Sequence, residues 1–137
     1  MKKLCFLLLA TVCCLATFGQ TDIAVKNLSV GSDGWIKLQE SASFIISVKS
    51  QNCNGVTSFL LKLENKSNED ITIKWHHRKT GEAAPASEAM QSIMVDKNTT
   101  KEGVCPPADQ MTIKQSLVTY LYDGVNLQDL VFTLQIN

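Results

Sequence analysis

The stretch SQNCNGVTSFLLKLENKSNEDITIKWHH, Ser50 to His77, carries the clearest structural pattern in the chain. Apolar residues alternate with their neighbours in two runs, at Phe59, Leu61 and Leu63 and then at Ile71, Ile73 and Trp75. A period of two is typical of a strand with one buried face. Six polar, turn-prone residues, 65–70, separate the runs. The pair is therefore predicted to form a β-hairpin with a short loop.

The same alternation recurs on both sides of this stretch. Phe44, Ile46 and Val48 share one face of a strand, and the final run 130–136 repeats the pattern. Weaker strands are expected at 23–30, 35–39, 93–96, 111–115 and 117–122, with glycine-containing turns between most of them. Seven to nine short strands with frequent turns predict an all-β fold, an immunoglobulin-like antiparallel β-sandwich.

The first 19 residues predict export. Lys2 and Lys3 precede an apolar run, 4–16, and small residues follow it, which is the order of a secretory signal peptide. The run has 13 residues, whereas a helix needs about 20 to cross a bilayer. Cleavage is expected after Gly19, with Ala16 as the alternative, and no membrane span is expected after cleavage. The protein would then be periplasmic, on the cell surface or extracellular.

Two rival interpretations of the leader stay open. The first alternative to a cleaved signal peptide is a retained anchor. The second is a lipoprotein signal in which Cys13 or Cys14 becomes lipidated, although neither cysteine follows a Gly or Ala. Cleavage after residue 19 leaves 20–137, 118 residues that are enough for a single domain. These hold 11 basic and 13 acidic residues, a net charge of −2. Such a balance argues against nucleic-acid binding and against attraction to an anionic membrane.

Two cysteines, Cys53 and Cys105, remain after the leader. An even pair in an exported chain usually forms a disulfide, and a bridge closing about 50 residues would stabilise the fold by roughly 4 kcal/mol. Two free buried thiols, or a reactive or metal-binding role, are the alternatives. A catalytic thiol needs a nearby base, and the chain's two histidines, His76 and His77, lie at the end of a different strand.

No motif in the chain predicts catalysis, a cofactor or a metal. His76 and His77 are adjacent, so in a strand they point to opposite faces, with His76 outward, and do not bind one ion without a bulge. Gly-x-Ser-x-Gly, the phosphate loop, the dinucleotide fingerprint and the calcium loop are all absent from the sequence. A pair of carboxylates brought together in space stays open. The sequence predicts a protein that is not an enzyme.

An aromatic pair is the candidate contact for a ligand. Tyr120 and Tyr122 share one face of a predicted strand and precede Asp123. Facing outward, such a pair can stack on a glycan or a partner protein. The alternative is that the two rings cover the edge of the sandwich core.

Four segments, NCNG, LLKLENKSNEDITIKW, IMVDKNTTKEGVC and LQDLVFTLQIN, together with a leader ending in FGQ, carry a family resemblance. Over roughly 51–137 the chain resembles short exported proteins of uncharacterised function from Bacteroidetes. The resemblance implies strands, hairpin turns and a structural pairing of Cys53 with Cys105. It implies no catalytic residues.

Three functions follow as hypotheses. The first is an exported, non-catalytic binding or structural module of the cell envelope, an accessory subunit or adhesion-type domain whose partner is an envelope protein or glycan. The second is a carbohydrate or small-ligand binding module that uses Tyr120, Tyr122 and neighbouring polar residues. The third is a hydrolase, for which the sequence offers no assigned catalytic group.

Overall fold

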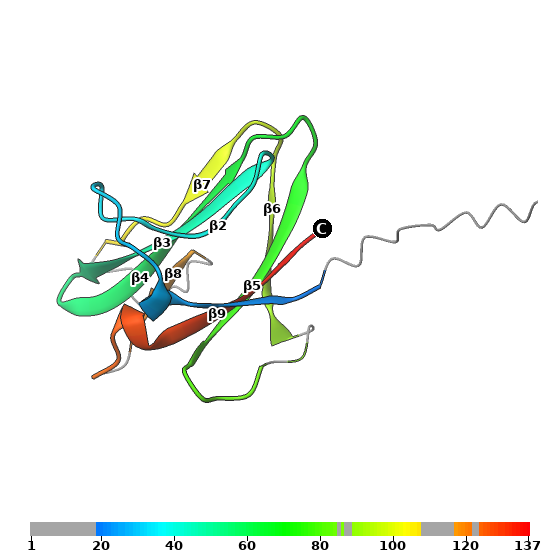
Figure 1. Ribbon diagram of the computed structural model, residues 1–137. Coiled ribbons are helices and arrows are strands. Elements are labelled where there is room, and N and C mark those ends of the chain that lie inside the picture. The colour runs from blue at the N-terminus through cyan, green and yellow to red at the C-terminus, as the bar shows by residue number, and fades with distance from the viewer. Residues whose placement is uncertain (1–18, 85, 87–88, 108–116, 122–123) are drawn as a thin grey trace, which may run out of the picture.

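The computed structural model describes residues 19–84, 86, 89–107, 117–121 and 124–137, and these form two antiparallel sheets packed face to face (Figure 1). The four-stranded sheet has the order β1 (Thr21–Ala24), β9 (Leu130–Ile136), β5 (Ile71–Lys79) and β6 (Gln91–Val95). The five-stranded sheet has β2 (Ile36–Glu40), β3 (Phe44–Cys53) and β4 (Val56–Asn65), with β7 (Thr100–Glu102) and β8 (Val118–Tyr120) both paired to β4. The predicted all-β sandwich is confirmed, with nine strands in the described residues.

The core lies between the inward faces that the alternation predicted. Fully or almost fully buried side chains come from both sheets, among them Ile46, Val48, Phe59, Leu61, Leu63, Ile73, Trp75, Phe132 and Leu134. Phe59 of β4 and Phe132 of β9 meet edge to face, with ring centroids 5.2 Å apart. Such a pair contributes attraction beyond the area that it buries. The predicted inward faces of 44–48, 59–63, 71–75 and 130–136 are therefore confirmed.

The predicted hairpin between the first two runs is wrong. β4 and β5 belong to different sheets, so residues 65–70 carry the chain from one layer of the sandwich to the other (Figure 1). The pairs are instead β3 with β4 and β5 with β9 and β6. Alternation records that one face is buried, and it is the same whether two strands pair edge to edge or face each other across a core.

Asn65 shapes this corner through a buried carboxamide. Its Nδ2 donates to the carbonyl oxygens of Glu69 at 2.7 Å and Val95 at 3.0 Å, and its Oδ1 accepts from the backbone N–H of Ser67 at 2.9 Å. Val95 ends β6, a strand of the opposite sheet. Because the amide is 2% exposed and its donors and acceptor are all used, Asn65 links the end of one sheet to the other without an unpaired polar group.

The strands that the sequence predicted more weakly begin and end at other residues than expected. The expected strand 23–30 is the short β1 followed by a 3-10 turn, Val25–Asn27, while 35–39 and 93–96 correspond to β2 and β6. β7 was not predicted, because its three residues, Thr-Lys-Glu, contain no apolar position. The expected strand 111–115 lies outside the described residues, as does Tyr122 of 117–122.

β7 and β8 occupy the same edge of β4, one after the other. The chain leaves this edge at Gly103, whose N–H donates to the Leu61 carbonyl at 2.8 Å, and rejoins it at Leu117, whose carbonyl accepts the Leu61 N–H at 2.9 Å. A Cβ on Gly103 would collide with the backbone carbonyl of Leu117. Only glycine therefore allows the departing and returning segments to approach so closely.

Gly103→Ala should lower the free energy of unfolding by about 2 kcal/mol, because the added methyl group must push backbone apart in a packed region. Urea denaturation followed by circular dichroism measures the loss. Val104→Ala is the matched control at the next position, where the side chain is 66% exposed, and it should change stability by less than about 0.5 kcal/mol. Equal stabilities for the two variants would show that the strands do not meet at Gly103.

Candidate functional site

A disulfide joins Cys53 at the end of β3 to Cys105 beyond β7. The S–S distance is 2.04 Å and the Cα atoms lie 5.3 Å apart, within the usual range for a bridge. Cys53 is fully buried, and the Asn54 side chain donates to the Pro106 carbonyl at 2.8 Å beside it. The predicted pairing is confirmed, and the alternatives of free, reactive or metal-binding thiols at these positions are wrong.

The disulfide belongs to a second apolar cluster, the disulfide cluster, on the side of the five-stranded sheet that faces away from the core. Its buried members are Trp35, Cys53, Leu60 and Val118, and Cys105 and Tyr120 pack against them. The alternation did not predict this cluster, since it assigned a single buried face to β4. The three consecutive apolar residues 59–61 were the available signal, because an uninterrupted run indicates a strand buried on both faces.

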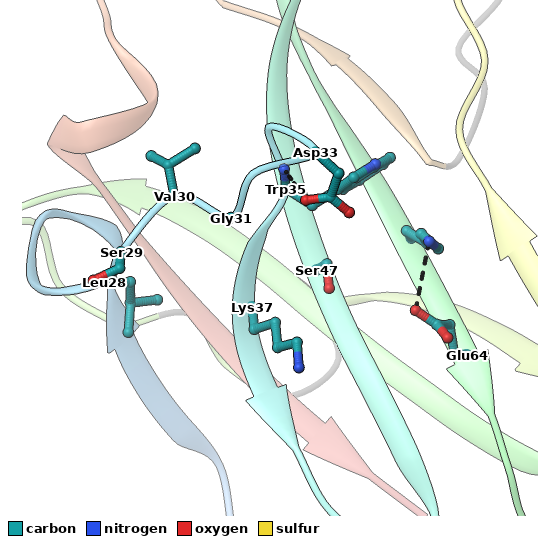
Figure 2. Close-up of a pocket in the computed structure, with 10 residues that line it drawn as sticks. Leu28, Ser29, Val30, Gly31, Asp33, Trp35, Lys37, Ser47 and Glu64 are labelled. Carbon is teal, nitrogen blue, oxygen red and sulfur yellow. Dashed lines mark hydrogen bonds and ion pairs between the residues drawn. The ribbon is translucent and has the colours of Figure 1, made fainter.

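Next to this cluster the outer surface of the sheet is hollowed into a groove of about 360 Å³. Figure 2 shows residues 28–31 along one wall, Asp33 and Trp35 at one end, and Lys37 and Ser47 on neighbouring strands. Lys62 and Glu64 of β4 complete the lining. We call this feature the outer-face groove.

The strand register brings the polar residues of the outer-face groove together. Lys37 of β2 lies opposite Ser47 of β3, which lies opposite Lys62 of β4, so the three form one row across the sheet. Glu40 accepts a hydrogen bond from Lys37 at 2.8 Å, and Glu64 lies 3.6 Å from the Lys62 ammonium. The hydrogen bond raises the pKa of Lys37 and lowers that of Glu40. The groove thus carries ammonium donors and carboxylate acceptors side by side.

Trp35 forms a rigid end wall for the groove. Only 8% of the residue is exposed, and the ammonium groups of Lys49 and Lys62 lie 4.7 and 5.5 Å from its ring centroid. Its backbone N–H donates to Asp33 Oδ1 at 3.2 Å. Because lysines already occupy the ring, Trp35 positions its neighbours and does not present an open face for stacking.

The two histidines take different environments, as expected. His77 packs edge to face on Phe59 in the core, with centroids 4.9 Å apart, whereas His76 is paired with Thr133 in the register of β5 and β9. The two rings are closer than strict alternation implies, since they stack with centroids 5.8 Å apart. Parallel rings do not direct their nitrogens at one ion. Among the described residues no cluster of His, Cys, Asp and Glu could hold a metal.

Of the predicted ligand contacts, only Tyr120 lies in the described part of the chain; Tyr122 and Asp123 fall outside it. Tyr120 is partly buried against the disulfide cluster, and its hydroxyl is buried with no hydrogen-bond partner among the described residues. The same residue lines a small pocket together with His77. The register with Ser58 places the Tyr120 side chain on the outward face of the sheet, away from His77, and ligand contact at Tyr120 stays a prediction.

The outer face of the other sheet carries a compact ionic network. Arg78 of β5 donates to Asp22 of β1 at 2.6 Å and to the buried Thr133 of β9 at 2.6 Å, and the Thr133 hydroxyl donates to Asp22 at 2.6 Å. The hydrogen bond from Arg78, followed by that from Thr133, lowers the pKa of Asp22. The network ties the short β1 across β9 to β5.

Asp22→Asn should reveal this network through the pH dependence of stability. The folded-state pKa of Asp22 lies below its unfolded value of about 3.9, so its stabilisation is complete above about pH 4 and is lost as the pH falls through the folded pKa. The Asp22 side chain is 48% exposed, and screening by solvent limits the expected loss at pH 7 to about 0.5–1 kcal/mol. The difference between the variant and the wild type in urea denaturation should shrink as the pH falls from 5 to 2.

Glu69→Gln is the control for this measurement, because Glu69 is exposed and its carboxylate forms no ion pair among the described residues. It should leave stability unchanged at both pH values. A loss for Asp22→Asn that is the same at pH 2 and pH 7 would mean that the carboxylate charge is not what stabilises β1.

Within the described ranges no helix is long and apolar enough to cross a membrane. Comparison with known proteins gives no match among family models, curated proteins or solved structures. The resemblance to exported Bacteroidetes proteins consequently stays an expectation.

Proposed function

We propose that this protein is an exported, non-catalytic binding module of the cell envelope, an accessory subunit or adhesion-type domain, that makes contact through the outer-face groove. Export is supported by the leader, with Lys2 and Lys3 before an apolar run, and by the disulfide, since such bonds persist in oxidising compartments.

The row Lys37–Ser47–Lys62 is the observation that carries the proposal. It crosses β2, β3 and β4 on the outer side of the five-stranded sheet, beside the cluster that contains Trp35 and the disulfide. The paired strands fix the spacing of the three Cα atoms of this row, so its polar groups are offered from a rigid backbone.

The balance of charge in the groove favours a polar partner surface over an apolar or strongly charged one. Asp33 and Glu64 offer acceptors within the same lining as the ammonium groups of Lys37 and Lys62. Mixed donors and acceptors match the hydroxyls of a glycan or the polar rim of a protein interface. A carbohydrate-binding module is therefore the second candidate, supported by this mixture of groups.

A crosslinking pull-down tests the proposal. Oxidised protein, residues 20–137, is incubated with the cell-envelope fraction of its own source, crosslinked, and analysed by mass spectrometry and by glycan staining. Lys37→Glu should abolish recovery of the specific partner, because it places a third carboxylate in the groove opposite Ser47. The Lys37 side chain is 59% exposed, so the substitution should leave the fold intact.

Lys74→Glu is the matched control, since Lys74 lies on β5 in the other sheet, pairs with Gln135 and faces a different surface. It should recover the partner as the wild type does. A protein captured only by wild type and Lys74→Glu supports the accessory or adhesion-type function, and a glycan captured in that pattern supports the second candidate. Equal recovery by all three proteins would exclude the groove as the contact surface.

A further inference from the structure

The turn between β3 and β4 is formed by the dipeptide Asn54–Gly55, directly beside the disulfide. Cys53 is paired with Val56 in the register, so these two residues are the whole loop. Both are exposed and both have positive φ, 54° for Asn54 and 88° for Gly55. A two-residue loop of this conformation is a type I′ turn, for which Asn-Gly is a preferred sequence. Asn-Gly occurs at no other position of the sequence.

An Asn-Gly dipeptide is also prone to deamidation. The backbone nitrogen of Gly55 loses its proton and attacks the side-chain carbonyl carbon of Asn54. A C–N bond forms, the C–N bond to the side-chain amide breaks, and ammonia leaves. Water then opens the resulting succinimide ring to aspartate or isoaspartate. Glycine favours the attack, because it has no side chain to hinder the approach of its nitrogen.

Two hydrogen bonds hold the groups that would react. The Gly55 N–H, which carries the attacking nitrogen, donates to Asn52 Oδ1 at 2.7 Å. The Asn54 side-chain amide, which would leave as ammonia, donates through Nδ2 to the Pro106 carbonyl at 2.8 Å. A group that must first give up one hydrogen bond reacts about fivefold more slowly, since only the molecules without that bond are competent.

The backbone of the turn opposes the same reaction. The succinimide ring contains the bond between the Cα and the carbonyl carbon of Asn54, so ring closure sets the ψ torsion of this residue. The ring requires a ψ that a type I′ turn does not have. Because the pairing of Cys53 with Val56 holds the turn, the ring forms only in molecules in which the turn has opened.

The disulfide holds both sides of this arrangement together. Cys53 directly precedes Asn54, and Cys105 directly precedes Pro106, which lies 52 positions from Asn54 along the chain. We propose that Asn54 is a deamidation site that the Cys53–Cys105 disulfide protects, so that a chain without the bridge is modified there and a bridged chain is not. This inference does not depend on contact through the outer-face groove.

The modification would be permanent and would loosen the segment that carries Cys105. Aspartate at position 54 replaces the Nδ2 donor with a carboxylate oxygen, which only accepts hydrogen bonds and therefore repels the Pro106 carbonyl. Isoaspartate adds a carbon to the backbone of a two-residue turn. A chain that forms its disulfide late would thus carry a chemical record of the delay.

Removing the bridge tests the proposal. Oxidised wild type and Cys53→Ala/Cys105→Ala, both as residues 20–137, are held in mildly alkaline buffer, and deamidation at Asn54 is followed by peptide mass spectrometry. The double variant should react about fivefold faster, the equivalent of the lost Pro106 hydrogen bond. Trp75→Ala is the matched control, because it is destabilised to a similar extent and keeps the bridge. It should react like wild type.

Asn52→Ala tests the turn without touching the disulfide. Asn52 is exposed and its Oδ1 accepts from the Gly55 N–H, so the variant frees the attacking nitrogen and should leave the fold intact. Deamidation at Asn54 should again be about fivefold faster than in oxidised wild type. Oxidised wild type unfolded in urea gives the rate of the unprotected site and should be the fastest of all.

Three results would overturn the proposal. Equal rates at Asn54 in oxidised wild type and in the double variant would show that the bridge does not protect the site. An equal acceleration in Trp75→Ala would assign the protection to overall stability and not to the disulfide. A folded, oxidised wild type that reacts as fast as the urea-unfolded protein would mean that neither the turn nor its hydrogen bonds restrain Asn54.

Discussion

Removing the Cys53–Cys105 disulfide should lower the free energy of unfolding by about 4 kcal/mol. The bridge spans a sequence separation of 52, and in the chain-entropy model a loop of that length restricts the unfolded chain by this amount. Replacing the cysteines also removes packing contacts from the native state, because Cys53 is fully buried in the cluster with Trp35 and Leu60. Domains of this size are stable by about 5–15 kcal/mol, so the loss is a large share of the total.

Urea denaturation of Cys53→Ala/Cys105→Ala against oxidised wild type measures the effect, with the melting temperature expected to fall by roughly 15 °C. The double variant avoids the free thiol that either single variant would leave. Wild type treated with a reductant should unfold at nearly the same urea concentration as the double variant. Val104→Ala, next to Cys105 and exposed, is the control that should resemble oxidised wild type.

Thiol labelling decides whether the bridge is present in solution. Oxidised wild type should be unreactive with a thiol reagent under native conditions and after denaturation, and should take up two labels after reduction. Labelling of both cysteines without reductant, or a double variant within 1 kcal/mol of wild type, would contradict the structural role of the disulfide.

The fold class was predictable because burial leaves a local trace. Phe59, Leu61 and Leu63 alternate in the sequence and are buried in the core, as are the corresponding residues of β3, β5 and β9. Sheet membership left no such trace. The polar corner 65–70 has the composition of a hairpin loop, yet Asn65 directs it across the sandwich by bonding to the Val95 carbonyl, a residue 30 positions away. A partner that far along the chain is not visible in a local pattern.

The candidate site was less predictable than the fold. The outer-face groove depends on Lys37, Ser47 and Lys62 standing in one row, and the register shifts within β2 between Lys37 and Gln39. A slip of one residue moves every side chain of a strand to the opposite face, and sequence alternation alone does not locate a bulge. Cysteine counting, by contrast, needed no register, and the Cys53–Cys105 pair was predicted correctly.

Trp75→Ala should destabilise the protein by about 3–5 kcal/mol, the range for removing a large buried aromatic side chain. Trp75 is 1% exposed, lies on the inward face of β5 and stands opposite Leu134 of β9. The cavity left between the sheets cannot be filled from the strands, whose backbones are held by pairing on both sides. Trp35 remains in the variant as the fluorescent reporter for urea denaturation.

Trp75→Phe separates the volume of this side chain from its polar group. The indole N–H of Trp75 is buried and has no hydrogen-bond partner among the described residues. Phenylalanine keeps most of the apolar contact and removes that unpaired donor, whose burial is unfavourable. Its expected loss is therefore only about 1–2 kcal/mol. A loss below 1 kcal/mol for Trp75→Ala would instead mean that β5 turns its other face to the core, because removing a buried tryptophan costs more than that.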